Sequence, residues 1–195
     1  MTVFYLVRHA AHARQGESLV GRTPGIGLGE AGRQQIAWLQ RRFEGLTFAA
    51  VCCGPLERAV LTAEALAPQA TIAPELDEVD YGDWTGRTIA ALEGDPLWQA
   101  WNGFRAGTRI PGGETMLEVQ LRAVRLIDRL REAHPEGRVL LVSHGDVIRA
   151  VLLHYLGLSA DLFGRIEVDP GSLCVLAVEP WGARVLRLNE AAALP

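Results

Sequence analysis

Short apolar segments without polar alternation recur along the 195-residue chain. Such segments are typical of strands that other elements cover on both faces. Strands of this kind are predicted at residues 3–7, 48–53 and 138–143, with a minor strand at 71–72. Two later strands, at 172–178 and 183–188, are joined by only a short turn. We therefore expect that pair to be antiparallel.

Between these segments, apolar residues recur at the spacing of amphipathic helices. The helices are predicted at residues 30–44, 55–67, 114–133 and 147–156. The helix at 114–133 carries an apolar stripe made of Leu117, Leu121, Val124, Ile127 and Leu130. Alternation of strands with helices predicts an α/β fold, specifically a three-layer α/β/α sandwich around a mostly parallel mixed sheet.

The composition is that of one globular domain spanning residues 1–195. Apolar residues make up 49% of the chain and charged residues 22%, which excludes a disordered chain. The segment 79–113 interrupts the alternation and contains three of the five tryptophans. Two interpretations stay open for it, a lid over a site beyond the strand ends and a small satellite core under a long loop.

The charged residues and cysteines limit which partners, cell compartment and reaction classes fit this chain. A net charge of −4 disfavours nucleic acid and anionic membranes as partners. The chain has no apolar run long enough to span a membrane and no signal-peptide pattern at its start, and its three cysteines suit a reducing compartment, so we expect a cytoplasmic protein. All 19 basic residues are arginines, which excludes a Walker A loop and lysine Schiff-base chemistry.

Three predicted strands end in polar residues that suit an anion. The first strand runs into Arg8 and His9, and the fourth into the sequence Ser-His-Gly-Asp at 143–146, where a helix begins. Arg58 lies one turn into the helix after the second strand. Ligands of open α/β sheets bind beyond the carboxyl ends of the strands, and helix N-termini favour anions. The sequence therefore predicts that these groups converge on one site.

The segment Leu6-Val7-Arg8-His9 resembles the signature of the histidine phosphatase superfamily, also called phosphoglycerate mutase-like. Further segments are similar to the family's motifs and follow in the family's order, at 21–25, 54–64, 76–86, 112–115 and 142–145. The resemblance implies the family's α/β fold and a phosphoryl-transfer site that needs no metal or other cofactor.

Carried over position by position, the resemblance implies a role for each matching residue. His9 would be the nucleophile that forms a phosphohistidine, and Glu78 would be the proton donor. The phosphate pocket and its substrate contacts would be formed by Arg8, Arg22, Thr23, Arg58, His144 and Gly145. The residue types fit these roles. A guanidinium group binds two phosphate oxygens at once, and a carboxyl group near bound phosphate keeps its proton more readily.

Some positions do not decide between alternatives. Asp77, Asp80 and Asp83 are rival proton donors by spacing, and only the family motif selects Glu78. The residue after the nucleophile is Ala10, where the family usually has glycine, and the family's Glu-Thr and Asn are missing from 11–15. Arg14 and Gln15 are the candidates to replace the Asn contact.

His12 stands three residues after His9, a spacing that metal ligands on a helix can have. Both histidines follow a strand, however, and Arg8 makes their surroundings cationic, so no metal is expected there.

The expected function is hydrolysis of a small phosphomonoester through a phosphohistidine. The alternatives are a phosphoglycerate mutase-type transfer and a non-catalytic relative. A mutase must exclude water from its intermediate, and the segment 79–113 offers only about 35 residues for a lid. We expect a small phosphorylated metabolite as the partner. The sequence does not name the substrate, and sugar phosphates, phosphoglycerates, cobalamin-pathway nucleotides and phosphoproteins all stay open.

Overall fold

The computed structural model describes residues 1–14, 16 and 18–192. The strands in this part of the chain are β1 (Thr2–Arg8), β2 (Ala50–Cys53), β3 (Thr71–Ile72), β4 (Arg138–Ser143), β5 (Leu173–Glu179) and β6 (Gly182–Glu190). They form one six-stranded sheet in the order β3-β2-β4-β1-β5-β6. The first four strands of that order are mutually parallel, whereas β5 is antiparallel to both β1 and β6. The predicted mixed, mostly parallel sheet is confirmed.

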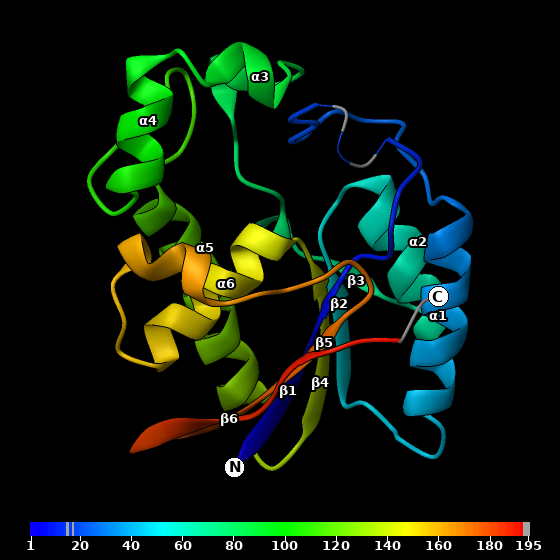
Figure 1. Ribbon diagram of the computed structural model, residues 1–195. Helices are drawn as coiled ribbons and strands as arrows, with labels where there is room; N and C mark the ends of the chain where they lie inside the picture. The colour runs from blue at the N-terminus through cyan, green and yellow to red at the C-terminus, as the bar shows by residue number, and fades with distance from the viewer. Residues whose placement is uncertain (15, 17, 193–195) are drawn as a thin grey trace.

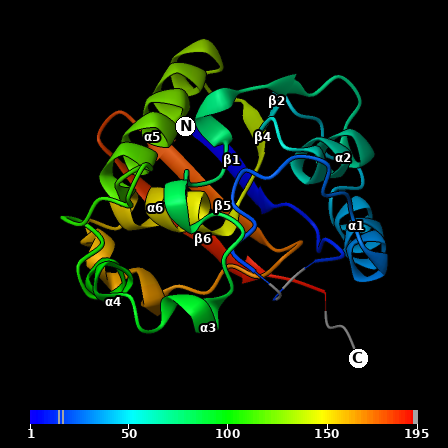
Figure 2. The same ribbon diagram turned by 90° about the horizontal axis from the view of Figure 1, so that it is seen from above.

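Helices cover both faces of the sheet. The long helices are α1 (Glu30–Arg42), α2 (Glu57–Leu66), α5 (Met116–Ala133) and α6 (Gly145–Tyr155). Figures 1 and 2 show α1 and α2 on one side of the sheet and α5 and α6 on the other. The buried apolar residues divide into two clusters accordingly, one on each face. This arrangement is the predicted three-layer α/β/α sandwich. Within the described residues, no helix is both long and apolar enough to cross a membrane.

The predicted apolar stripe of α5 is wrong in part. Leu117 and Leu121 are 47% and 49% exposed. The buried residues of this helix include Met116, Val119 and Ala123 instead. These positions also recur at helical spacing, and they belong to the core cluster on this face of the sheet. Periodicity alone did not distinguish the two faces.

The segment 79–113 forms short helices, η2 (Gly82–Trp84), α3 (Ile89–Leu92) and α4 (Pro96–Gly103). In Figure 1, α3 and α4 lie at the same end of the molecule as the blue loop that follows β1. Trp84 and Trp101 are fully buried and belong to the core cluster on the α5 and α6 side. The tryptophans therefore extend the main core.

Candidate active site

The ends of β1 and β4 place two histidine rings together. The strands are parallel neighbours with Arg8 paired to Ser143, and the backbone N–H of His9 donates to the Ser143 carbonyl oxygen at 2.8 Å. The rings of His9 and His144, the residues that follow these strands, are 4.9 Å apart between centroids. Both side chains are buried. The convergence predicted for the strand ends is confirmed for these residues.

His9 is held in one tautomer by its own loop. Its Nδ1 lies 2.9 Å from the Ala10 carbonyl oxygen, which can only accept a hydrogen bond, so Nδ1 carries the proton of the neutral ring. Burial, and then the positive charge of Arg58, hold the pKa of His9 well below its ordinary value. Nε2 is therefore an unprotonated nitrogen, as a nucleophile requires.

Two helices fix the loop after His9. The Ala10 N–H donates to the Thr62 hydroxyl on α2 at 3.1 Å, and the Ala11 N–H donates to the Gln35 amide oxygen on α1 at 2.7 Å. Ala10 is fully buried in this arrangement. The loop therefore accommodates alanine at the position where the family usually has glycine.

Arg8 and Arg58 are each anchored by one hydrogen bond. Arg8 donates to the Val168 carbonyl oxygen and Arg58 to that of Gly21, both at 2.7 Å. The other guanidinium atoms include Arg8 Nε and Arg58 Nε and Nη1, which are buried and lack a hydrogen-bond partner among the described residues. Both ring nitrogens of His144 are likewise buried and lack a hydrogen-bond partner among these residues. Unsatisfied buried donors cost free energy, and a bound anion would satisfy them.

Gly145 lets Arg8 reach this position. A Cβ at Gly145 would lie 3.2 Å from both the guanidinium carbon and Nε of Arg8. Gly145 is also the first residue of α6, so the guanidinium lies against a helix N-terminus, whose free N–H groups favour an anion. The strand-end residues thus combine two cations, two imidazoles and a helix terminus.

A cavity of about 180 Å³ opens at this end of the sheet. Its lining combines basic side chains with two acids and a glycine-containing loop, namely Arg8, His9, His12, Gly16, Ser18, Leu19, Val20, Gly21, Arg58, Glu78, Tyr81, Gly145 and Asp146. Within the described part of the segment 79–113, Tyr81 alone contributes to this lining. His144, also expected as a substrate contact, does not line the cavity, and its ring adjoins that of His9.

Glu78 is a carboxyl group that keeps its proton near neutral pH. Burial, and then the negative charge of Asp146, raise the pKa of Glu78 to about 7. One carboxyl oxygen accepts the Val79 N–H at 2.9 Å, and the other lies 3.5 Å from Nδ1 of His144. Glu78 therefore holds a transferable proton beside the imidazoles and guanidinium groups.

The rival carboxylates point elsewhere. Asp77 and Asp80 lie 3.3 and 3.5 Å from the guanidinium of Arg22, and neither these two nor Asp83 lines the cavity. Among the four acidic residues of this segment, Glu78 alone reaches it. The geometry therefore favours the carboxylate that the family motif selects.

Arg22 and Thr23, expected as substrate contacts, are not brought into the cavity lining. Besides the two aspartates, Arg22 binds Glu114 at 2.9 Å and donates to the Glu78 carbonyl oxygen at 2.8 Å. It therefore holds the segment that carries Glu78. Gln15 lies outside the described residues, and Arg14 does not line the cavity.

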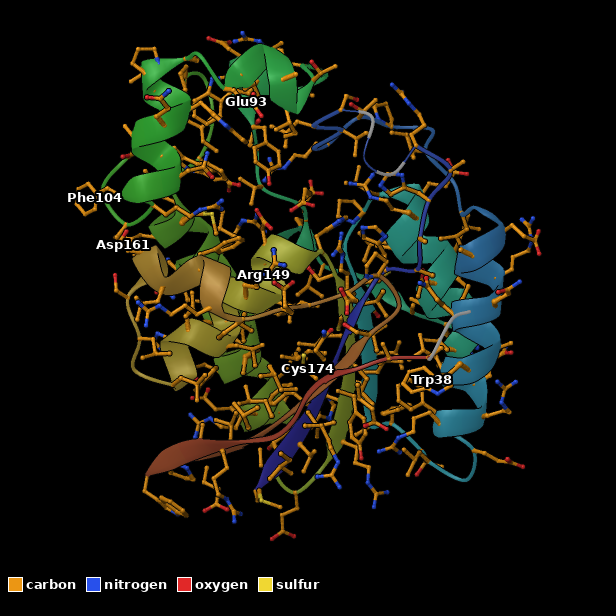
Figure 3. All side chains as sticks on the ribbon, viewed as in Figure 1. Trp38, Glu93, Phe104, Arg149, Asp161 and Cys174 are labelled. Carbon is orange, nitrogen blue, oxygen red and sulfur yellow. The ribbon has the colours of Figure 1, made fainter. Side chains whose placement is uncertain are left out.

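No role of their own was predicted for Tyr81 and Asp146, and His12 was considered only as a metal ligand. The Tyr81 hydroxyl donates to an Asp146 carboxylate oxygen at 2.7 Å. Arg149 on α6, which Figure 3 labels, donates to the other oxygen at 3.3 Å. A signal was available for Asp146, because it directly follows the His-Gly pair at the start of α6. Within the described residues, no three His, Cys, Asp or Glu side chains are arranged to hold a metal ion.

The sequence pattern of the histidine phosphatase superfamily (branch 1) matches residues 4–191. The chain belongs to this family.

Known relatives agree with this assignment. The bifunctional protein Rv2228c of Mycobacterium tuberculosis is 36% identical over 83% of this chain, which spans only 46% of that relative's length. The probable phosphoglycerate mutase GpmB of Cronobacter sakazakii is 32% identical, covering 93% of this chain and 88% of its own. The solved structure of the alpha-ribazole phosphatase from Shigella flexneri superposes with a TM-score of 0.85 at 27% identity, covering 96% of each chain.

Proposed function

We propose that this chain is a phosphatase that hydrolyses a small phosphomonoester through a phosphohistidine on His9. The observation that carries the proposal is the neutral His9 ring, whose unprotonated nitrogen lies among buried, unsatisfied guanidinium and imidazole donors. Phosphoryl transfer needs in-line positioning and charge neutralisation around the phosphoryl oxygens. This group of side chains suits both needs.

In the first step, His9 Nε2 attacks the phosphorus and the bond to the ester oxygen breaks. Glu78 gives its proton to that leaving oxygen, and the alcohol departs. In the second step, a water oxygen attacks the phosphorus and the phosphorus–nitrogen bond breaks. The Glu78 carboxylate takes the water proton, and inorganic phosphate leaves. Arg8 and Arg58, which line the cavity, stabilise the phosphoryl oxygens in both steps, and His144 supplies a further donor from beside His9.

Hydrolysis is favoured over transfer to a second hydroxyl by the small part of the segment 79–113 that lines the cavity. Only Tyr81 of the segment 79–113 contributes to the lining among the described residues, and a mutase must keep water away from its phosphoenzyme. The one observation that favours transfer is the relative named as a probable phosphoglycerate mutase. The cavity is smaller than a typical ligand pocket, which favours a small metabolite.

A phosphate-release screen tests the proposal. The panel includes sugar phosphates, phosphoglycerates, alpha-ribazole phosphate and a phosphopeptide. We expect one small ester to be hydrolysed by the wild type and by a His154→Ala control, which changes an exposed histidine on α6, but not by His9→Ala. Hydrolysis that persists in His9→Ala would refute the nucleophile, and the absence of any hydrolysed ester would refute the phosphatase.

The mutase alternative is tested separately with 3-phosphoglycerate and a bisphosphoglycerate primer. Isomerisation that exceeds phosphate release by tenfold or more, about 1.4 kcal/mol in barrier height, would identify transfer as the main reaction.

A further inference from the structure

The backbone of His12 is held in place beside the cavity. His12 pairs with Leu28 in an isolated antiparallel bridge, and the Gly29 N–H donates to the Ala11 carbonyl oxygen at 2.9 Å. The chain segments approach so closely that a Cβ at Gly29 would lie 3.3 Å from the Ala13 nitrogen. The loop therefore presents the His12 side chain from a fixed position.

The ring of His12 faces the same cavity as the proposed nucleophile. His12 lines the cavity, and its ring centroid lies 5.7 Å from that of His9. Its Nδ1 is buried and has no hydrogen-bond partner among the described residues. This nitrogen is thus in the same unsatisfied state as the donors of Arg8, Arg58 and His144.

The charged groups around His12 indicate what kind of ligand would satisfy it. Burial, and then the positive charges of Arg58, Arg8 and Arg14, lower the pKa of His12. The His9 ring beside it is neutral as well. A neutral imidazole still has one N–H to donate, and cationic surroundings favour an anionic acceptor over a metal ion. The proposed reaction places such an acceptor, a phosphoryl oxygen, next to His9.

We propose that His12 is a further catalytic residue that contacts the phosphoryl group, with its Nδ1–H donating to a non-bridging oxygen. This inference rests on the phosphatase function proposed above. A hydrogen bond to a phosphoryl oxygen strengthens as charge builds up in the transition state. His12 would thereby supply a contact to the phosphoryl group from the loop in which the family's usual residues are missing.

Orthovanadate, which takes up a five-coordinate geometry like that of the phosphoryl transition state, is the probe. The variants are His12→Ala and His12→Asn, with His154→Ala as the control. Asparagine can place an amide N–H near the position of Nδ1, whereas alanine cannot. We expect His12→Ala to raise the vanadate inhibition constant by about tenfold to a hundredfold and to lower kcat for an aryl phosphate. His12→Asn should recover most of both losses, and all variants should unfold at the wild-type temperature.

The possible outcomes separate this inference from the function on which it rests. One outcome is that the wild type hydrolyses phosphomonoesters while His12→Ala binds vanadate as tightly as the wild type. That result would refute the role of His12 and leave the proposed phosphatase function in place. If both His12 variants lose activity together with thermal stability, His12 is structural and the inference is refuted. If the wild type neither hydrolyses an ester nor binds vanadate, both proposals are refuted.

Discussion

Glu78→Gln removes the proton that the proposed mechanism transfers to the leaving group. The pKa of Glu78 is raised to about 7, so the share of the enzyme that carries this proton falls as the pH rises from 7 to 8. With an alkyl phosphate, whose leaving oxygen must be protonated, kcat/KM of the wild type reports the free enzyme and should fall about tenfold for each pH unit above 7. The Glu78→Gln variant should lack this decline.

The size of the loss should depend on the leaving group. General acid catalysis contributes roughly a hundredfold to ten-thousandfold, so Glu78→Gln should lose about that much activity on the alkyl phosphate. An aryl phosphate with an acidic phenol leaves without a proton, and its formation of the phosphoenzyme should be much less affected. A rapid-quench measurement of the first turnover isolates that step from the later attack of water.

Asp83→Asn is the matched control, because Asp83 belongs to the same acidic segment, is exposed and does not line the cavity. It should keep wild-type kcat on both esters. Equal first-turnover losses on the alkyl and aryl esters in Glu78→Gln would refute the role of Glu78 as general acid.

Three further predictions concern stability. Gly32→Ala would place a Cβ 2.3 Å from the Ala11 carbonyl oxygen, so it should lower the free energy of unfolding in urea by about 1–3 kcal/mol and lower kcat by displacing the nucleophile loop. The Arg105 guanidinium lies 3.7 Å from the ring centroid of Trp101 and 3.8 Å from that of Phe163. Arg105→Ala should therefore lower the free energy of unfolding by about 1–2 kcal/mol in the same assay, whereas Arg165→Ala, at an exposed residue, should leave it unchanged. The pKa of Glu78 is raised to about 7 in the folded state, so the folded protein holds this proton more tightly than the unfolded chain does. The resulting stabilisation is full below about pH 4 and is lost as the pH rises through 7. Urea titrations at pH 6 and 8 should show this loss in the wild type and not in Glu78→Gln.

Much of the fold follows from local sequence pattern. Buried parallel strands appear as short apolar runs, and β4 spans the predicted residues 138–143. Helix boundaries are less accurate, since α2 begins at Glu57 rather than at Pro55. The exposed face of α5 could not be predicted, because two helical faces of this segment are apolar and only packing against the rest of the core selects between them.

The site was predictable where topology dictates it. Arg8, His9 and His144 come together because Arg8 ends β1 and the two histidines directly follow the neighbouring parallel strands β1 and β4. Arg22 was not predictable in this way, since its long side chain can reach several partners and the sequence does not show that it takes Asp77, Asp80 and Glu114. Burial raises the pKa of Glu78 only after residues distant in sequence have closed around it.

The central claim is a covalent phosphohistidine at His9, and trapping that intermediate tests it most directly. Wild-type enzyme is quenched during steady-state turnover of a labelled ester, and the labelled residue is mapped by mass spectrometry. The mechanism predicts acid-labile, base-stable phosphate on His9 that is absent from His9→Ala and present in the His154→Ala control. Label on any other residue, or continued turnover by His9→Ala, would contradict it.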